Sequence, residues 1–332
     1  MVVFYTLNTF VHFSFLNTAA SPAGIAVIHS LFNIGATILL FPFANLLEKM
    51  AILAIPDKGS EVEEMEEEKI NPDLARLDER FLDKPGFAME ECRGVAINMA
   101  RKSKKAMNLA IDLLKEYDEK TSARVEKLEN QIDQYEDALG TYLVKLSERD
   151  LSVKDSRILS VLLHCIGDFE RISDHAVNIR DAAVEMNKKN LQFSDKAKQE
   201  LLVFSNAIRD IIDRAVLAFE TGDTGLAKEV EPLEQVVDAL NKEEKQRHIN
   251  RLRTGTCTIE LGFVLSDIST NFERAADHCS NIAVCLLQVD EGGFDTHEYL
   301  DILKEENSEE FRHEYMELSE KYTLPESKHG GK

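Results

Sequence analysis

A thirteen-residue segment that occurs twice places the strongest constraint on the fold. Residues 168–180 read DFERISDHAVNIR and residues 271–283 read NFERAADHCSNIA, so seven of the thirteen positions carry the same residue at a separation of 103. A second pair lies upstream, with LENQID at 128–133 and LEQVVD at 233–238, which are 105 residues apart. Two segments that recur in the same order at nearly the same separation indicate an internal duplication.

The spacing of apolar residues predicts that each copy is helical. Apolar residues step by three and four along 125–139 and again along 230–240, which is typical of a helix packed on its neighbours. Five polar segments interrupt this pattern, at 116–121, 147–152, 187–192, 220–225 and 253–258. They divide the region into six helices of roughly 25 to 35 residues. We therefore predict an all-α fold with two repeated three-helix bundles, over about 86–190 and about 191–290.

The first 47 residues contain no Asp, Glu, Lys or Arg, although 30% of the whole chain is charged. Residues 23–47 are mostly apolar and would form about 37 Å of helix, enough to cross a hydrocarbon layer of about 30 Å. Residues 1–16 are marginal for a second span. A signal peptide would need a basic start, and a buried soluble hairpin would need a polar face. Residues 1–55 are therefore predicted to form a terminal transmembrane hairpin.

The segments outside the bundles are strongly charged. Six glutamates fall within residues 61–68, so residues 56–85 are predicted to be a solvated acidic linker, and residues 291–332 a charged tail. The formal net charge of −21 argues against nucleic acid and against a polybasic contact with anionic lipid. Five cysteines without a Cys-x-x-Cys pair indicate neither a disulfide framework nor a zinc ribbon, and they favour a reducing compartment.

The repeated segment places acidic residues at helical spacing. Glu170, Asp174 and Asn178 lie on one stripe of a helix, opposite an apolar stripe, and Glu273, Asp277 and Asn281 repeat the pattern. Two carboxylates at positions i and i+4 repel each other unless a cation lies between them. If a matching pair on the second helix of each bundle faces this stripe, each half presents four carboxylates, which suit magnesium, manganese, iron or zinc.

A solvated face is the alternative interpretation, because Asp and Glu make up 60 of the 332 residues. The arginines and histidines beside the stripe are expected to be ion-pair partners or to support the ligands from behind: Arg171, Arg274, His175 and His278. A di-iron oxidase would need Glu-x-x-His on inward-facing helices, whereas the Glu-x-x-His at 310–313 lies in the charged tail. No nucleophile motif or glycine-rich phosphate loop is present, so we expect no enzymatic activity.

The motif Glu-Arg-x-x-Asp-His-x-x-Asn-Ile, present twice in a six-helix region, resembles the PhoU family. Its members are paired three-helix bundles that bind metal through acidic motifs and regulate phosphate uptake. The resemblance covers about residues 86–290. It implies eight metal ligands: Glu129, Asp133, Glu170, Asp174, Glu234, Asp238, Glu273 and Asp277.

The membrane end carries a second resemblance. The segment AVIHSLFNIGATILLFPF at 26–43 is similar to the His-x-x-Phe-Asn segment that closes the transport domain of bacterial type II sodium–phosphate cotransporters, and it contains His29, Phe32 and Asn33. LDERFLDKPGFA, SPAGIAV and FDTHEYL also fit members that carry a PhoU-like region. Transport in that family uses Gln-Ser-Ser motifs, whereas this sequence has no glutamine before Gln131. Most of the membrane domain is therefore expected to be missing.

Together these features predict the C-terminal part of a sodium-dependent phosphate transporter. Sodium would be the coupling ion, and sodium and phosphate would bind in the missing domain. The helical region would regulate transport from the cytoplasmic side of the cell membrane, from about residue 56 onward. The alternative is a membrane-anchored PhoU-like metal-binding regulator without transport activity. A homo-oligomer is also expected.

Overall fold

The computed structural model describes residues 71–291 and 309–325, all of which belong to one compact unit, Glu68–Lys332. The residues that the structure describes form six long helices: α4 (Pro85–Leu113), α5 (Glu119–Ser147), α6 (Val153–Lys189), α7 (Asp195–Thr221), α9 (Val230–Arg253) and α10 (Ile259–Glu291). The shorter elements are the 3-10 helices η3 (Leu74–Arg76) and η4 (Glu79–Asp83) and the helices α8 (Thr224–Lys228) and α12 (Glu309–Lys321).

Local side-chain chemistry explains where the long helices begin and end. Asp118, Ser152 and Ser194 lie just before α5, α6 and α7, and each side chain accepts a hydrogen bond from a backbone N–H of the first turn. At the other ends, Asn190 and Gly222 adopt left-handed backbone conformations with φ of 53° and 68°. Four of these five residues lie within the polar segments that the sequence marks as breaks, and Ser194 lies two residues beyond one of them. The predicted all-α fold with six long helices is therefore confirmed.

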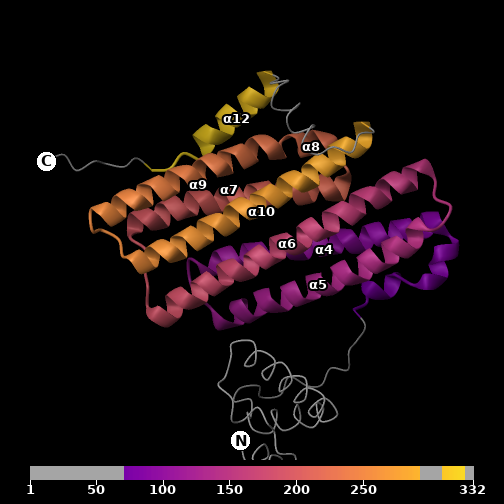
Figure 1. The fold of residues 1–332 in the computed structure, drawn as a ribbon, viewed down its shortest axis with the longest axis horizontal. Helices are drawn as coiled ribbons and strands as arrows, with labels where there is room; N and C mark the ends of the chain where they lie inside the picture. Colours follow the sequence, from indigo (N-terminus) through magenta and orange to yellow (C-terminus); the bar gives the residue numbers. More distant parts are fainter. Residues whose placement is uncertain (1–70, 292–308, 326–332) are drawn as a thin grey trace, which may run out of the picture. The chain divides into compact units, whose positions relative to one another are not determined.

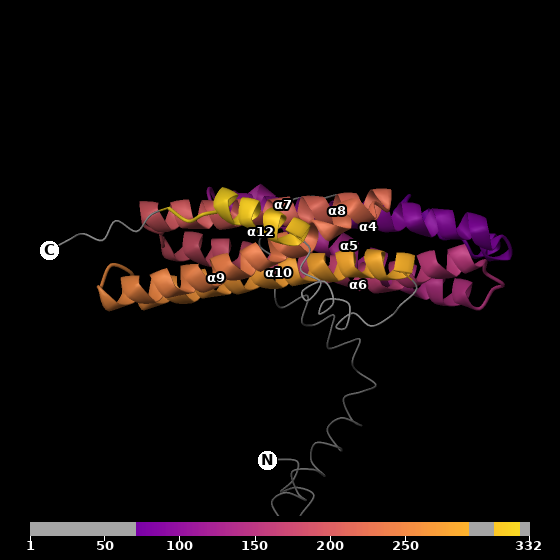
Figure 2. The ribbon, with the colours of Figure 1, turned by 90° about the horizontal axis from the view of Figure 1, so that it is seen from above.

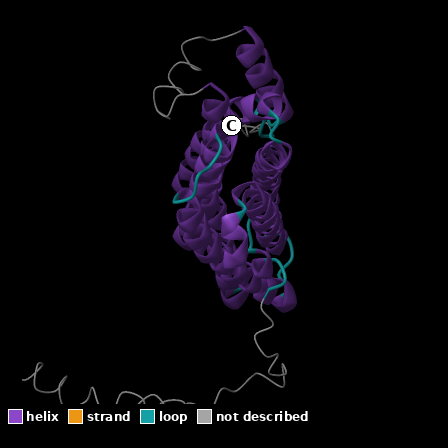
Figure 3. Ribbon diagram, turned by 90° about the vertical axis from the view of Figure 1, so that its right-hand side faces the viewer, coloured by secondary structure: helices purple, strands orange, loops and turns teal. Residues whose placement is uncertain are grey.

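The six helices form two three-helix bundles that share one core. Helices α4, α5 and α6 pack together, as do α7, α9 and α10, and the two groups meet where α6 lies beside α10 and α4 beside α7 (Figures 1 and 2). Seen from the end, the described helices form two layers (Figure 3). The ring of Phe169 on α6 packs edge-on against Phe219 on α7, with centroids 4.9 Å apart. The hydrophobic core therefore continues from one bundle into the other.

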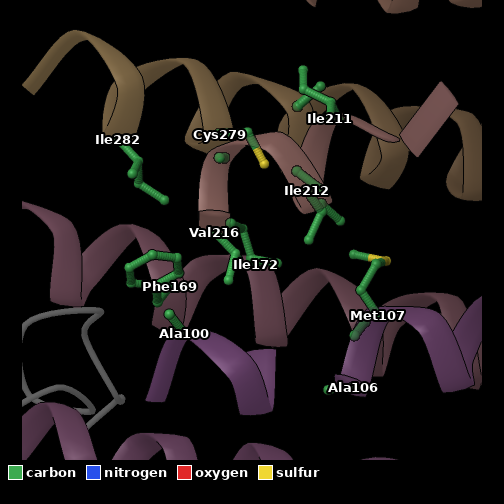
Figure 4. Packing of buried hydrophobic residues seen from close by; sticks show 14 of the residues in the cluster. Ala100, Ala106, Met107, Phe169, Ile172, Ile211, Ile212, Val216, Cys279 and Ile282 are labelled. Carbon is green, nitrogen blue, oxygen red and sulfur yellow. The ribbon is translucent and has the colours of Figure 1, made fainter. Parts of the chain in front are cut away.

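Alanine and β-branched residues dominate the junction between the bundles. Figure 4 shows side chains of α4, α6, α7 and α10 pointing toward one another, with Ala100 of α4 near Phe169 of α6 and Ile172 of α6 near Val216 of α7. These four side chains are buried. Small residues allow helix axes to approach closely, and larger neighbours fill the remaining space, as in other densely packed helical cores.

Two flanking segments pack on the bundles. Within the predicted acidic linker, residues 71–84 lie against the first bundle, where the Tyr135 hydroxyl donates to Asp73 and the Tyr142 hydroxyl donates to the Asp78 carbonyl over 2.9 Å. Within the predicted charged tail, α12 packs on α9, and Tyr322 just beyond it is buried and donates to Asp210 over 2.8 Å. These hydrogen bonds and the burial of Tyr322 therefore hold both segments against the bundles despite the surrounding charge.

The predicted membrane hairpin lies outside the described residues, as do His29, Phe32 and Asn33. Within residues 71–291 and 309–325, no helix combines the length and hydropathy that a bilayer crossing requires.

Candidate functional site: two acidic clusters and the seam between the repeats

The duplicated segment presents two different polar faces of the same helix. On α6, Glu170 and Asp174 interact with carboxylates of α5, whereas Asp168 and His175 bind residues of α10. The buried residues Phe169, Ile172, Ala176 and Ile179 point into the core between these faces. The repeat therefore encodes an acidic surface, a packed core and a contact between the repeats in one helix.

The first acidic cluster comprises Glu129 and Asp133 of α5 and Glu170 and Asp174 of α6. Burial, together with the nearby charges of Asp174 and Asp133, raises the pKa of Glu129. Burial and Asp174 likewise raise the pKa of Glu170, and Arg171 opposes this effect. The carboxylates of α5 and α6 therefore lie near enough to one another for their charges to interact.

The second acidic cluster comprises Glu234 and Asp238 of α9 and Glu273 and Asp277 of α10. Burial, followed by Glu273 and Asp238, raises the pKa of Asp277. Lys242 Nζ lies 2.9 Å from Asp238 Oδ2, and this hydrogen bond is the main cause of the raised pKa of Lys242, to which Glu234 also contributes. The second repeat thus brings carboxylates of its second and third helices together, as the first repeat does.

Basic and amide side chains already contact both clusters. Arg171 Nε lies 3.5 Å from Glu170 Oε2, and its Nη1 lies 3.5 Å from Asp174 Oδ2. Glu273 Oε2 accepts a hydrogen bond of 2.7 Å from Asn241 Nδ2 and lies 3.9 Å from Lys245 Nζ. The sequence analysis expected Arg171 to be such an ion-pair partner. These contacts neutralise part of the negative charge of each cluster.

The clusters fit a hard cation by the chemistry of their donors, because carboxylate oxygens suit magnesium, manganese, iron and zinc. Burial is the main cause of the raised pKa values of Glu129, Glu170 and Asp277, and the neighbouring carboxylates add to it; this repulsion between like charges also favours a bound cation. However, the described part of the chain contains no group of three or more His, Cys, Asp or Glu side chains arranged to hold a metal ion. The carboxylates would have to rotate away from partners such as Arg171 and Lys242 to converge on one ion.

A polar seam joins the two repeats, and its residues occur in pairs that are 103 positions apart in the sequence. Asp168, His175 and Asn178 of α6 correspond to Asn271, His278 and Asn281 of α10. The imidazole rings of His175 and His278 stack with centroids 5.5 Å apart and an angle of 26° between their planes. Each repeat contributes the same three positions, so the histidine pair marks a pseudo-two-fold relation between the bundles.

Hydrogen bonds cross the seam in both directions. His278 Nδ1 lies 2.8 Å from Asp168 Oδ1, and His175 Nδ1 lies 2.8 Å from Asn271 Oδ1. Asn178 Nδ2 donates to Asn271 Oδ1 over 3.0 Å. Asn271 Nδ2 donates to the Asp267 carbonyl, so the orientation of this amide is consistent with Oδ1 accepting from α6. Burial lowers the pKa of His175 and favours the neutral ring.

The seam contains three residues that the sequence analysis placed on or beside the acidic stripe: Asn178, His175 and His278. It expected the histidines to be ion-pair partners or to support metal ligands, and His278 does contact the Asp168 carboxylate, whereas His175 and Asn178 bond to the Asn271 amide across the repeats. It did not select Asp168 or Asn271, because the first position of the repeated segment differs between the copies. Asp and Asn both offer an acceptor oxygen at that position, and this shared property could have indicated that the position forms a hydrogen bond in both repeats.

The sequence matches the PhoU domain twice, over residues 96–183 and 201–286, which together make up more than half of the chain. The chain belongs to the PhoU domain family. The two matches coincide with the two bundles, and each includes one acidic cluster and one half of the seam.

Individual relatives agree with this assignment. The phosphate-specific transport system accessory protein PhoU homolog 1 of Thermotoga maritima is 23% identical over 188 residues, which cover 56% of this chain and 80% of the relative. The PhoU homolog of Pseudomonas aeruginosa is 23% identical over 219 residues, covering 66% and 90%. The crystal structure of PhoU from P. aeruginosa superposes with a TM-score of 0.58 at 22% identity, covering 61% of this chain and 97% of that one. The similarity of this structure shows that the fold is shared.

Proposed function

We propose that the helical region of this chain regulates phosphate transport. The observation that carries the proposal is that the PhoU domain match spans both bundles and includes an acidic cluster in each. The relatives from Thermotoga maritima and Pseudomonas aeruginosa are named as accessory proteins of a phosphate-specific transport system. Regulation would act through binding of a cation or a partner protein at the acidic clusters, without an enzymatic step.

The finer proposal joins this regulatory region to the end of a sodium–phosphate cotransporter domain. It is supported by the charge-free residues 1–47 and by the His-x-x-Phe-Asn segment that contains His29, Phe32 and Asn33. In this proposal residues 1–55 insert in the cell membrane, and the bundles lie on its cytoplasmic side. The alternative is an anchored regulator that acts on a separate transporter.

A metal ion would supply positive charge that several carboxylates could share. The chain's own residues would prepare for it in two ways. Carboxylates of α5 and α6, or of α9 and α10, lie close enough to repel one another, and Arg171 and Lys242 partly neutralise them. Exchange of such a basic partner for a cation would alter how tightly the second and third helices of a bundle pack.

Membrane attachment and regulation can be tested together in bacterial cells. After expression of the full-length chain, we expect it in the membrane fraction after a carbonate wash, with protease cleaving residues 56–70 only from the cytoplasmic side. We also expect the chain to change the rate of radiolabelled phosphate uptake. Sodium-dependent uptake in a strain without other phosphate transporters would favour the cotransporter; an effect seen only beside another transporter would favour the anchored regulator. Recovery as a soluble protein with no effect on uptake would contradict the proposal.

A further inference from the structure

The two repeats differ sharply at one end of their cores, where the loop between α9 and α10 lies near the loop between α6 and α7 (Figure 1). The helices of the repeats can be matched at separations of 105 for α4–α7 and α5–α9 and of 103 for α6–α10. Six matched positions carry Val95, Leu139, Tyr142, Leu143, Leu146 and Ile166 in the first repeat. The same positions carry Glu200, Glu244, Arg247, His248, Arg251 and Ser269 in the second.

The first repeat shows that apolar side chains are sufficient at these positions. Val95, Leu139, Leu143 and Leu146 are fully buried there. In the second repeat Glu200 and Glu244 are also buried, although both carry a carboxyl group. Replacing buried ion pairs by apolar residues of similar volume is often neutral or stabilising. The fold alone therefore gives no reason for the charged residues of the second repeat.

Part of this polar core has a structural partner. Arg247 Nη1 donates to Glu200 Oε1 over 2.9 Å and to the Pro325 carbonyl over 2.6 Å, so Arg247 ties the C-terminal segment to α9. Arg251 Nη1 also donates to Glu200. The remaining donors lack such an explanation: within the described residues, Arg251 Nη2 and His248 Nε2 are buried without a hydrogen-bond partner. Buried donors without partners are costly and indicate a role beyond stability.

The fold makes specific room for His248. A Cβ atom at Gly262 of α10 would lie 2.5 Å from His248 Nε2, so any larger residue there would force the ring to move. The first repeat has Leu159 and Leu143 at these two positions. His248 Nδ1 lies 3.8 Å from Cys257 Sγ in the loop between α9 and α10. Burial and the nearby Arg251 charge lower the pKa of His248, so the ring is neutral.

Arg251 and His248 border a cleft of about 320 Å³, which is large enough for a small organic molecule. Ser194 and Thr258, which precede α7 and α10, also line it, so the positive ends of two long helix dipoles meet there. Thr256 adds another hydroxyl. Although the chain has a net charge of −21, the lining of this cleft includes no Asp or Glu.

We propose that this cleft binds a small oxyanion, namely the phosphate or carboxylate group of a small metabolite. The guanidinium of Arg251 would bind the oxyanion through its unpartnered Nη2, after a small rotation that exposes this atom. The hydroxyls of Ser194 and Thr258 would supply further donors, while Phe193 and Leu265 contact the apolar part of the ligand. This site is separate from the acidic clusters and goes beyond the proposed regulation of transport.

Calorimetric titration of the purified full-length chain with inorganic phosphate and with citrate tests the proposal, with chloride added to keep ionic strength constant. We expect at least one probe to bind at millimolar or lower concentration. Thr256→Glu places a carboxylate at the exposed edge of the cleft without altering the buried ion pairs and should raise the dissociation constant about tenfold or more. Thr254→Glu, which adds the same charge two residues away and outside the cleft lining, is the matched control.

Arg251→Gln should also weaken binding, whereas Arg253→Gln should not, because Arg253 is exposed and does not line the cleft. If Arg251→Gln fails to fold, the difference in dissociation constant between the Thr256→Glu and Thr254→Glu variants still tests whether the oxyanion binds in this cleft. Which probe binds would distinguish a phosphate site from a carboxylate site. Absence of binding by both probes in the unaltered chain, or equal binding by the Thr256→Glu and Thr254→Glu variants, would overturn the proposal.

Discussion

At the scale of single residues, Glu244 shows how burial alters acid–base behaviour in the second bundle. Only 1% of this residue is exposed, and burial raises its pKa to about 7, although a 2.5 Å hydrogen bond from Ser269 Oγ acts in the opposite direction. Its Oε1 has no hydrogen-bond partner among the described residues. At acidic pH Glu244 is therefore neutral in the folded chain, and at alkaline pH its buried charge opposes folding.

Glu244→Gln should remove this pH dependence. Between the pKa of an unfolded glutamate and about pH 7, the folded chain keeps a proton that the unfolded chain releases, so the free energy of unfolding falls as pH rises. The loss at Glu244 is about 3 kcal/mol. Urea unfolding at pH 5 and pH 8 should show that Glu244→Gln gains stability relative to the unaltered chain as pH increases.

Glu116→Gln is the control for this measurement, because Glu116 is exposed near the end of α4. It should change the free energy of unfolding by a similar small amount at both pH values. If the difference between Glu244→Gln and the unaltered chain were independent of pH, Glu244 would not be the buried titrating group.

At the scale of helices, the sequence predicted the helix ends, because these depend on local side-chain chemistry. Polar segments such as 147–152 and 187–192 mark helix ends because Ser152 and Asn190 interact with the backbone of their own turns. The seam could not be predicted in the same way, since Asp168 meets His278 only after α6 and α10 pack together. Alignment of the two repeats places His248 at the position of Leu143, which could have indicated a polar core in the second repeat. However, a polar or charged residue at helical spacing is equally typical of a solvated helix face, so the sequence alone did not show that these residues are buried.

The seam allows a carboxylate and an amide to be compared as partners of a histidine, because Asp168 and Asn271 occupy matched positions. Asp168 contacts His278, and Asn271 contacts His175. Asn271→Asp should raise the pKa of His175, since a carboxylate replaces a neutral acceptor 2.8 Å from its Nδ1. A proton NMR titration of the histidine ring protons would measure this change. Because a raised histidine pKa stabilises the folded chain below that pKa, the variant should also lose less stability on acidification toward pH 5.

Asn187→Asp is the charge-matched control. Asn187 lies on α6, the helix that carries His175, at an exposed position about three turns beyond it. It should leave the titration of His175 nearly unchanged. An unaltered His175 pKa in Asn271→Asp would show that the hydrogen bond across the seam does not form in solution.

At the scale of the whole molecule, the duplication places two acidic clusters on either side of one seam. Each cluster includes residues of a helix that also carries half of the seam: Asp174 precedes His175 on α6, and Asp277 precedes His278 on α10. A cation that reorients Asp174 or Asp277 therefore acts one residue away from the contact between the bundles. In the proposed function, this arrangement would link the state of each cluster to the packing of α6 against α10, which is a physical route for a signal to a partner.

Metal loading tests whether the repeated carboxylates form functional sites. For the purified full-length chain, stripped of metal with a chelator, we expect manganese, iron, zinc or magnesium to raise the free energy of unfolding by about 2.7 kcal/mol at a hundredfold excess over the dissociation constant. Asp174→Asn combined with Asp277→Asn should reduce this gain, because one carboxylate charge is lost from each cluster. The double variant should still fold, since neither change opens a cavity in the core.

A second double variant, Asp83→Asn with Asp150→Asn, removes the same charge at exposed positions outside both clusters and should keep the full metal effect. Equal stabilisation of the two double variants by every metal would show that the clusters are not the binding sites. If the first double variant instead failed to fold, Asp174 and Asp277 would serve mainly to hold helices together. That outcome would leave the acidic repeat a structural feature, because a site that only binds an ion tolerates removal of one ligand charge without global unfolding.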